Sequence, residues 1–466
     1  MSNHPCNTSP REELVPGEVV RVKGLDLDRQ GLGLARWQGW ILVIPNLLPG
    51  EIADVQLQQR HRSQWNGRLI ETIKQSPSRR KPRCGIAAEC GGCSLQHLKD
   101  HEQKVFKHSQ LRETLLRIGG ISHPIHPFIF SIDESFGYRN RGLIPLRRLS
   151  NGNLQMGYYK RGSHRIINLT ECPVLDQRLN DCLEAIKIDL GYSNWPADSD
   201  LLSGDGLRHI GLRIGNSTGE ILITLISSTD SLSGLKQQAK RWLDRWDSVK
   251  GVTLNLQPSR TNVILGSKTI VLAGEPSINE IFCGLNLKIS TTTFFQVNAV
   301  QAEEVVKLIC DWFAMKCAAK SVVDAYCGIG TISLPIAACG LQVLGLEINS
   351  DSIKQANLNA SSNCIGNVCF ISGDVAEHLA MALPDYDGLI VDPPRKGLND
   401  DVVSAIVENP PKNMAYLSCD PATLARDLKK LVGPIGPYTI AAIQPIDFFP
   451  QTTHIECLVF MTLVKP

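Results

Sequence analysis

The sequence predicts an α/β protein with three domains: an N-terminal β-barrel of OB type, a central α+β domain and a C-terminal Rossmann-like domain with a doubly wound parallel sheet. Three observations lead to this prediction. Short apolar runs separated by turn residues fill the first domain, closely spaced cysteines open the second, and strand-like and helix-like segments alternate in the third. We place the domain boundaries at 13–75, 76–288 and 289–466.

Composition is that of an ordinary globular protein. The 466 residues are 43% hydrophobic and 20% charged, enough for two or three domains with a large core. No apolar run approaches the roughly 18 residues of a membrane span, and the polar stretch from Met1 to Arg11 lacks the form of a signal peptide. We therefore expect a cytoplasmic protein without membrane contact. In that compartment, 15 cysteines favour thiols, clusters and catalysis over disulfides.

The net charge of +2 conceals two basic segments. Residues 60–83 carry eight Lys or Arg against one Glu, and residues 139–165 carry seven and no acid. This segregation favours a polyanionic partner for the N-terminal half, although two solvated basic loops would give the same pattern. Aromatic residues lie within or beside these segments: Trp65, Tyr138, Tyr158 and Tyr159. They favour RNA, because single-stranded bases stack on aromatic faces.

The first domain is predicted from its apolar runs. The expected strands are 17–22, 31–35, 40–44 and 51–57, in a set of about five. Strands of this length and spacing favour a small antiparallel barrel of OB type, a fold that often binds nucleic acid.

Four cysteines have the spacing of metal ligands. Cys84, Cys90 and Cys93 lie close together, and Cys172 follows 78 residues later, directly before Pro173. Four thiolates are the ligand set of an iron-sulfur cluster. Zinc accepts the same set, and the spacing alone does not separate the two metals.

The central domain reads as mixed α and β. Helical periodicity covers residues 94–118, and a strand-rich stretch then runs from Tyr138 to about residue 285. Helices are expected near 173–190 and 232–246. The strands between them alternate in polarity, which favours antiparallel pairing.

The third domain alternates strands and helices. The expected strands are 321–325, 342–347, 368–372, 388–391 and 414–417. Such alternation predicts a parallel sheet with ligands at the carboxyl ends of its strands. Two further strands, 438–443 and 455–463, follow without a helix between them, which predicts a closing hairpin.

A nucleotide-like cofactor fits the start of this sheet. Gly328 and Gly330 allow a tight turn after the first strand, and Glu347 ends the second strand 19 residues after Gly328. A carboxylate at that distance accepts hydrogen bonds from ribose hydroxyls, in NAD enzymes as well as in methyltransferases. The stiff loop Asp392-Pro393-Pro394 after the fourth strand is typical of methyltransferases that act on planar bases or amines, and it favours S-adenosylmethionine.

Cys419 lies between a strand and a helix. Asp420 is a good N-cap and Pro421 a good first helical residue, so the first helical amides are expected to point at the Cys419 sulfur. That position favours a thiolate, which acts as a nucleophile or a metal ligand. A small buried residue closing a strand is the alternative.

Four motifs occur together in this chain: Cys419, the loop Asp392–Gly397, the late sequence His454-Ile455-Glu456-Cys457 and the turn 323–330. In this combination the chain resembles the RNA methyltransferases that methylate carbon 5 of uridine. The resemblance covers nearly the whole chain. It implies that the barrel is a TRAM domain, that the third domain binds S-adenosylmethionine, and that the closing hairpin is the reversed last strand of such methyltransferases.

The resemblance also assigns residues. It implies a 4Fe-4S cluster, rather than zinc, on Cys84, Cys90, Cys93 and Cys172. It implies these contacts to S-adenosylmethionine: Gln296, Tyr326, Glu347, Asp374 and Asp392. Cys419 would add to carbon 6 of the uracil, and Glu456 would remove the proton from carbon 5. The target base would have to leave its stack to reach Cys419.

The expected partner is RNA. The protein is expected to be a monomer. The barrel and the cluster are most similar to members that act on 23S ribosomal RNA, whereas related enzymes act on transfer RNA. Two other functions stay open on the residues alone. One is a nucleic-acid methyltransferase that acts on an amine, and the other is an RNA-binding iron-sulfur protein without catalysis.

Overall fold

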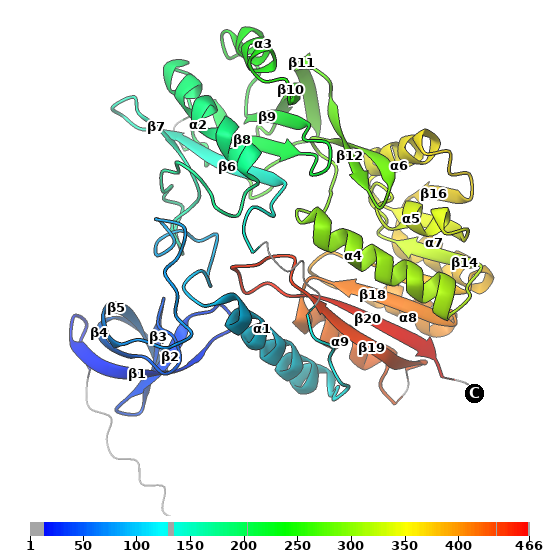
Figure 1. Cartoon of the computed structure of the whole chain (residues 1–466), viewed down its shortest axis with the longest axis horizontal. Helices are drawn as coiled ribbons and strands as arrows, with labels where there is room; N and C mark the ends of the chain where they lie inside the picture. Colours follow the sequence, from blue (N-terminus) through cyan, green and yellow to red (C-terminus); the bar gives the residue numbers. More distant parts are fainter. Residues whose placement is uncertain (1–13, 129–134, 203, 435, 465–466) are drawn as a thin grey trace, which may run out of the picture. The chain divides into compact units, whose positions relative to one another are not determined.

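The computed structural model describes residues 14–128, 135–202, 204–434 and 436–464. The chain divides into two compact units (Figure 1). Unit 1 contains the residues up to Lys107 together with Pro450–Thr453, and unit 2 contains His108–Phe449 and the residues from His454 onward. Within the described ranges, no helix has both the length and the apolar character needed to cross a membrane.

Unit 1 begins with a closed five-stranded barrel. Its strands are β1 (Val19–Leu27), β2 (Gly33–Trp37), β3 (Trp40–Ile44), β4 (Ile52–His61) and β5 (Gln64–Lys74). They pair in the order β1-β2-β3-β5-β4. Along β1, Val20 and Val22 are buried while Val19 and Arg21 are exposed, so alternate side chains fill the interior. The predicted OB-type barrel is confirmed, except that β3 and β5 pair in parallel where antiparallel pairing was predicted.

A single helix follows the cysteine-rich loop of unit 1. Helix α1 covers Asp100–Thr114 and continues as the π-helical turn η1 (Leu115–Gly119). It begins six residues later than the predicted range of 94–118. The reason is local: Leu98 pairs with Arg79 as an isolated bridge, which holds this stretch extended until Asp100.

The first sheet of unit 2 has six strands in the order β11-β10-β9-β8-β6-β7. The strands are β6 (Arg141–Arg148), β7 (Leu154–Met156), β8 (Leu207–Ile214), β9 (Ile221–Ser227), β10 (Val249–Leu256) and β11 (Lys268–Gly274), and the helices are α2 (Gln177–Tyr192) and α3 (Leu235–Arg245). The prediction of antiparallel pairing is wrong for β9 and β10, which run parallel. Helix α3 connects them as a crossover, and a crossover connection returns the chain in the same direction. A separate hairpin, β12 (Ser277–Phe282) and β13 (Leu285–Ser290), follows.

The second sheet of unit 2 has seven strands in the order β16-β15-β14-β17-β18-β20-β19. Its strands are β14 (Ser321–Ala325), β15 (Gln342–Glu347), β16 (Val368–Ser372), β17 (Gly388–Val391), β18 (Asn413–Ser418), β19 (Tyr438–Ile446) and β20 (Glu456–Leu463). Its helices are α4 (Ala299–Cys310), α5 (Ser333–Ala338), α6 (Ser350–Ser362), α7 (Val375–Ala382), α8 (Asp400–Glu408) and α9 (Pro421–Leu431), with the short turns η2 (Asp311–Lys316) and η3 (Leu383–Asp385).

This sheet is buried on both faces. Along β18, Met414 and Tyr416 pack into one apolar cluster, while Ala415 and Leu417 pack into another. The predicted strands agree with β14 to β17 residue for residue, because near-continuous apolar runs mark a parallel strand covered on both sides. Strand β20 runs antiparallel to both β18 and β19, which confirms the closing hairpin. The carboxyl ends of the parallel strands therefore meet at one edge.

Candidate active site

Three predicted site residues meet at this edge of the sheet. Cys419 follows β18, Asp392 follows β17, and Glu456 is the first residue of β20. Ser418 is paired with Cys457 in the β18–β20 ladder, so Cys419 and Glu456 are the next residues beyond that pair. Both Glu456 and Asp392 act electrostatically on the Cys419 thiol and raise its pKa. The fold thus brings together residues that are 27 and 37 positions away from Cys419 in the sequence.

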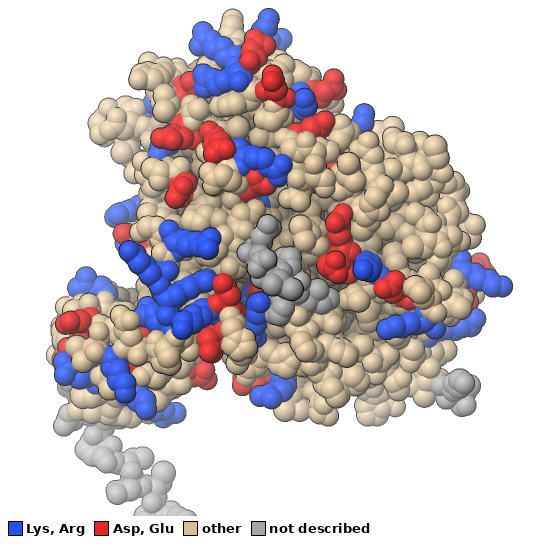
Figure 2. Space-filling view, viewed as in Figure 1, with Lys and Arg blue, Asp and Glu red and all other residues tan. Residues whose placement is uncertain are grey.

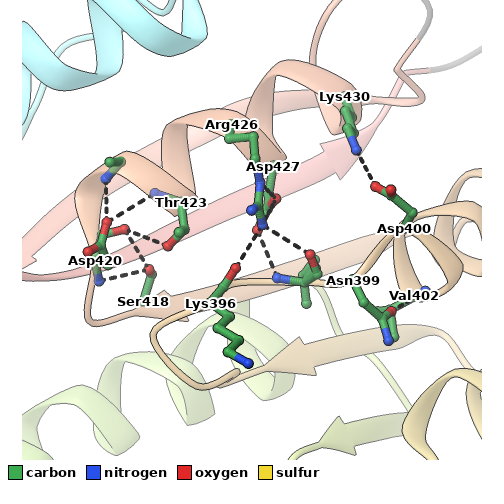
Figure 3. Close-up of polar contacts among 12 residues, drawn as sticks. Lys396, Asn399, Asp400, Val402, Ser418, Asp420, Thr423, Arg426, Asp427 and Lys430 are labelled. Atoms are coloured by element: carbon green, nitrogen blue, oxygen red, sulfur yellow. Dashed lines mark hydrogen bonds and ion pairs between the residues drawn. The ribbon is translucent and has the colours of Figure 1, made fainter.

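The seam between β18 and α9 has the predicted cap. Asp420 is the N-cap, and its Oδ1 accepts hydrogen bonds from the amides of Ala422 (2.8 Å) and Thr423 (3.1 Å) (Figure 3). The Asp420 amide donates in turn to Ser418 Oγ at 3.3 Å. Pro421 opens the helix, where its missing N–H is no loss. Cys419 is therefore held on a backbone fixed from both sides.

The prediction of a thiolate at Cys419 is wrong for this structure, because the pKa of the thiol is raised. Burial, then Glu456 and Asp392, raise the pKa of the Cys419 thiol to about 11, and Arg395 opposes them only in part. The amides of Ala422 and Thr423, which were expected to point at sulfur, donate to Asp420 instead. The carboxylate of Asp420 thus occupies the free amides at the helix N-terminus. These amides do not stabilise a thiolate, and Cys419 is a thiol at neutral pH.

The two carboxyl groups also have raised pKa values, and they hold their protons up to about neutral pH. Burial, with a smaller contribution from Asp392, raises the pKa of Glu456 to about 8. Burial and the neighbouring Asp324 raise the pKa of Asp392 to about 7. Glu456 is only 6% exposed. A carboxyl that titrates near neutrality beside a thiol is suited to proton transfer.

The turn after β14 shapes a second part of the site. Tyr326 (φ +69°), Gly328 (φ +57°) and Gly330 (φ +87°) lie in the left-handed region. The Gly328 amide donates to Glu347 Oε2 at 3.3 Å, which links the turn to the end of β15. A Cβ placed on Gly328 would meet no atom within 4 Å, so the backbone is open to an approaching ligand. This geometry fits the adenosine moiety of S-adenosylmethionine.

The other residues predicted for that ligand include Asp374, which lies near Tyr326, and Gln296. Asp374 is exposed and caps α7, accepting from the amides of Ala376 (2.8 Å) and Glu377 (3.3 Å). Burial, Asp374 and Glu347 all raise the pKa of Tyr326, to about 12, so these three side chains share one neighbourhood. Gln296 lies between β13 and α4, and its carbonyl accepts from Asn140 Nδ2 at 2.9 Å.

Sequence reasoning did not single out Asp324. Its side chain is fully buried, its Oδ2 accepts from Ser333 Oγ at 2.5 Å, and burial raises its pKa to about 7. Its Oδ1 finds no hydrogen-bond partner in the described part of the chain. An acid inside the apolar run 321–325 was the signal available in the sequence.

Known proteins resemble the chain over nearly its whole length. Residues 284–464 match the family model described as tRNA (uracil-5-)-methyltransferase, and residues 14–70 match the model of the TRAM domain. An uncharacterized RNA methyltransferase of Parasynechococcus marenigrum (strain WH8102) is 56% identical over 451 residues, which cover 97% of both chains. The chain belongs to the RNA (uracil-5-)-methyltransferase family. It is therefore an enzyme, and S-adenosylmethionine is its methyl donor.

Two further comparisons agree with the assignment of this chain to the uracil-5 methyltransferase family. An uncharacterized RNA methyltransferase of Nostoc sp. (strain PCC 7120) is 40% identical over 447 residues, covering 96% of this chain and 97% of the relative. The crystal structure of Pyrococcus abyssi tRNA (uracil-54, C5)-methyltransferase with S-adenosyl-L-homocysteine superposes with a TM-score of 0.76 at 25% identity. That comparison covers 95% of this chain and 99% of the other.

The four predicted cluster cysteines of this uracil-5 methyltransferase are divided between the units. In unit 1, the Cys84 amide donates to Gln96 Oε1 at 3.2 Å, and the Gly92 amide donates to Cys90 Sγ at 3.4 Å. In unit 2, the Cys172 amide donates to Asn180 Oδ1 at 2.8 Å. Across the residues that the structure describes, no group of three or more His, Cys, Asp or Glu side chains is arranged to hold a metal ion.

Several of the basic residues expected to contact RNA serve the fold instead. Arg79 pairs with buried Glu51 in unit 1. In unit 2, Arg147 pairs with Asp200 at 2.5 Å, and Arg148 donates to the carbonyls of Trp195 and Leu190. The side chains of these arginines are engaged in contacts within the protein.

The prediction of stacking aromatics is wrong for two residues. Trp65 is 3% exposed and belongs to the barrel core, and Tyr138 is 7% exposed. A buried ring offers no face to a base. Unit 1 nevertheless remains basic, with 15 Lys and Arg against nine Asp and Glu between residues 14 and 107. Figure 2 shows many of these cations on the visible face of that unit, with acids among them. The TRAM domain and this charge both support an RNA partner.

Proposed function

We propose that the enzyme methylates carbon 5 of a uridine in RNA through a covalent bond to Cys419, with Glu456 as the base. One observation carries this proposal: the thiol of Cys419 and the carboxyl of Glu456 lie at adjoining ends of β18 and β20, electrostatically coupled and beside Asp392. Carbon 5 of uracil is a poor nucleophile. A thiol that adds to the ring and a base that later restores it are the two groups that this chemistry requires.

In the first step, the Cys419 sulfur forms a bond to carbon 6 of the uracil. The electron pair of the carbon 5–carbon 6 double bond moves into the ring carbonyl and produces an enolate. The thiol proton must leave before or during this step, since its pKa is about 11. The carboxylate of Asp392, whose pKa lies near neutrality, accepts this proton, so Glu456 stays available for the last step.

In the second step, carbon 5 of the enolate forms a bond to the methyl carbon. Bound S-adenosylmethionine would supply that methyl group from its sulfonium, with S-adenosylhomocysteine as the leaving group. Carbon 5 then carries a methyl group and a proton. Ionised Glu456 takes the proton, the double bond reforms, and the bond between carbon 6 and the Cys419 sulfur breaks to release 5-methyluridine.

The residues proposed to hold S-adenosylmethionine are Gln296, Tyr326, Glu347, Asp374 and Asp392. The open backbone over Gly328 and the hydrogen bond from its amide to Glu347 support this set. We retain the domain boundaries at 13–75, 76–288 and 289–466, a cytoplasmic location and a monomeric state as proposals. Residues 1–13 lie outside the described part of the chain.

We also propose that Cys84, Cys90, Cys93 and Cys172 hold a 4Fe-4S cluster. The donor set fits, because four thiolates are its usual ligands, and the Gly92 amide already donates to the Cys90 sulfur as amides do around iron-sulfur clusters. Such a cluster lies far in sequence from Cys419 and would stabilise the fold or an RNA-binding surface.

Anaerobically purified protein is expected to contain about four iron and about four acid-labile sulfide per chain, with little zinc. Changing any one ligand, for example Cys90→Ser, should remove most of the iron. The matched control is Cys369→Ala, which alters an exposed cysteine on β16. One zinc and no sulfide in the wild-type protein would reject the cluster in favour of a zinc site.

The proposed substrate is 23S ribosomal RNA, on the resemblance of the barrel and the cysteine pattern to members that act on it. Transfer RNA is the second candidate. The superposition on a tRNA (uracil-54, C5)-methyltransferase favours it.

The test is to incubate the full chain with S-adenosylmethionine and, separately, unmodified 23S ribosomal RNA and unmodified transfer RNA. We expect 5-methyluridine, detected by mass spectrometry after digestion, in the ribosomal RNA only. If 5-methyluridine forms in transfer RNA alone, transfer RNA is the substrate and 23S ribosomal RNA is not. A methylated amine without 5-methyluridine would replace the proposed reaction by amine methylation.

A further inference from the structure

One buried acid in the catalytic domain has no part in the proposed chemistry. Asp427 lies on α9, two helical turns after the N-cap Asp420, and its side chain is fully buried. Its Oδ2 accepts hydrogen bonds from the Leu398 amide at 2.9 Å and from the Tyr416 hydroxyl at 2.7 Å. Its Oδ1 accepts from Arg426 Nε at 2.8 Å (Figure 3).

These bonds connect two segments of the site that are remote in sequence. Tyr416 belongs to β18, which leads to Cys419, whereas Leu398 ends the loop that begins at Asp392. One carboxylate thus holds the strand with the thiol and the loop with the acid in a fixed relation. A buried charge is costly, so each of its oxygens is satisfied by a donor.

Neighbouring side chains of α9 hold the same loop by its carbonyls. Arg426 Nη2 donates to the carbonyl oxygens of Lys396 (2.9 Å) and Leu398 (3.0 Å). The Thr423 hydroxyl lies 3.3 Å from the carbonyl oxygen of Arg395 and 3.1 Å from that of Asp420, so these two acceptors share its single proton. Three of the four residues from Arg395 to Leu398 therefore have a carbonyl oxygen in hydrogen-bond contact with one face of the helix. Figure 3 shows the contact between Arg426 and Lys396.

Gly397 is the remaining residue of this stretch. Its backbone lies so close to Asp427 that a larger side chain would not fit there. Its φ is +72°, and a Cβ built there would lie 2.5 Å from Asp427 Oδ2. The Gly397 amide donates to the Pro394 carbonyl at 2.8 Å, which closes the turn after the two prolines. The loop is thus stiff at its start and attached to α9 at its end.

We propose that Asp427, assisted by Arg426, is a positioning residue that fixes the loop Asp392–Leu398 against Cys419. This inference rests on the proposed function, because it assigns Asp392 and Arg395 to the neighbourhood of the reacting thiol. Asp427 acts through the loop and does not touch the substrate. A displacement of about 1 Å at a reacting centre can cost about 100-fold in rate, so loss of the attachment should lower kcat.

The main variant is Asp427→Asn, which keeps the size of the side chain. Its amide can accept hydrogen bonds at only one end, whereas Asp427 accepts at both. Either Arg426 or the pair Leu398 and Tyr416 then faces another donor. Because a buried change can also impair folding, Arg426→Ala is the second variant. The Arg426 side chain is 45% exposed, and alanine suits a helix.

The matched control is Lys430→Ala. Lys430 lies on the same helix and pairs with Asp400 at 2.5 Å, but this ion pair is exposed and does not include the loop (Figure 3). For each full-length variant we would measure kcat, KM for S-adenosylmethionine, the melting temperature, and the amide hydrogen exchange of the peptide that covers residues 392–398.

We expect kcat to fall about 10- to 100-fold in Asp427→Asn and about 3- to 10-fold in Arg426→Ala, with KM for S-adenosylmethionine within about 2-fold. Exchange of the loop should accelerate in both variants and not in Lys430→Ala. Faster exchange with an unchanged kcat would overturn the positioning role, and so would a loss of kcat in Lys430→Ala equal to that in Asp427→Asn.

Failure of the proposed function gives a different result. If the wild-type enzyme forms no 5-methyluridine, the proposed reaction fails. Hydrogen exchange still tests the attachment in that case: unchanged exchange in Asp427→Asn rejects it, and faster exchange supports it.

Discussion

Replacing Cys419 by alanine is expected to lower the rate of 5-methyluridine formation on the order of 10⁴-fold or more. Without the sulfur, no bond forms to carbon 6, and carbon 5 is not activated. The side chain is small and only half-buried at the start of α9, and the cap on Asp420 does not use the sulfur. Folding and the affinity for S-adenosylmethionine should therefore change little.

Three measurements define this result. Product is quantified by mass spectrometry, cofactor affinity by calorimetry, and covalent attachment by incubation with RNA that contains 5-fluorouridine, whose carbon 5 carries no removable proton. The wild-type enzyme and the Cys369→Ala control should form a complex that survives denaturing electrophoresis. Substantial activity in Cys419→Ala would show that the reaction does not use this thiol and would favour amine methylation.

Replacing Glu456 by glutamine is expected to lower the overall rate by about 10²- to 10⁴-fold and to trap the enzyme on its RNA. Addition of Cys419 and methyl transfer do not require this base, but release requires removal of the proton on carbon 5. A denaturation-resistant complex with ordinary RNA should therefore accumulate when S-adenosylmethionine is present. The control Glu408→Gln changes an exposed acid at the end of α8 and should behave as the wild type.

The same variant should alter the pH dependence of stability. Burial raises the pKa of Glu456 from its ordinary value of 4.5 to about 8, so between these values the folded protein keeps a proton that the unfolded chain has lost. The free energy of unfolding of the wild type thus falls as pH rises through this window, by on the order of 5 kcal/mol for this group. Glutamine cannot ionise, and Glu456→Gln should melt higher than the wild type at pH 9 but not at pH 5.

Thermal unfolding at the two pH values tests this expectation, with Glu408→Gln again as the control. If the wild type and Glu456→Gln differ by the same amount at both pH values, burial does not raise the pKa of Glu456 in the folded protein. If the control Glu408→Gln also forms a trapped complex with RNA, trapping does not identify Glu456 as the base.

Local sequence signals were enough to predict the order of the elements and the motifs. Largely apolar runs marked strands β14 to β17, because a parallel strand in a sheet covered on both faces has few polar residues. The N-cap Asp420 and Pro421 were local signals, and they predicted the start of α9. The order of Cys419, the Asp392 loop and Glu456 pointed to the family, which the comparisons confirm.

Only the tertiary structure decided what surrounds those residues. Burial and two acids from other strands raise the pKa of Cys419, although the local sequence favours a thiolate. Packing buries Trp65 and Tyr138, whose sequence context suggested base stacking. Asp427 forms its bonds to Leu398 and Tyr416 through the fold alone. Local sequence fixes caps, turns and strand periodicity, whereas desolvation and charge at a site depend on groups that the fold brings together from distant positions.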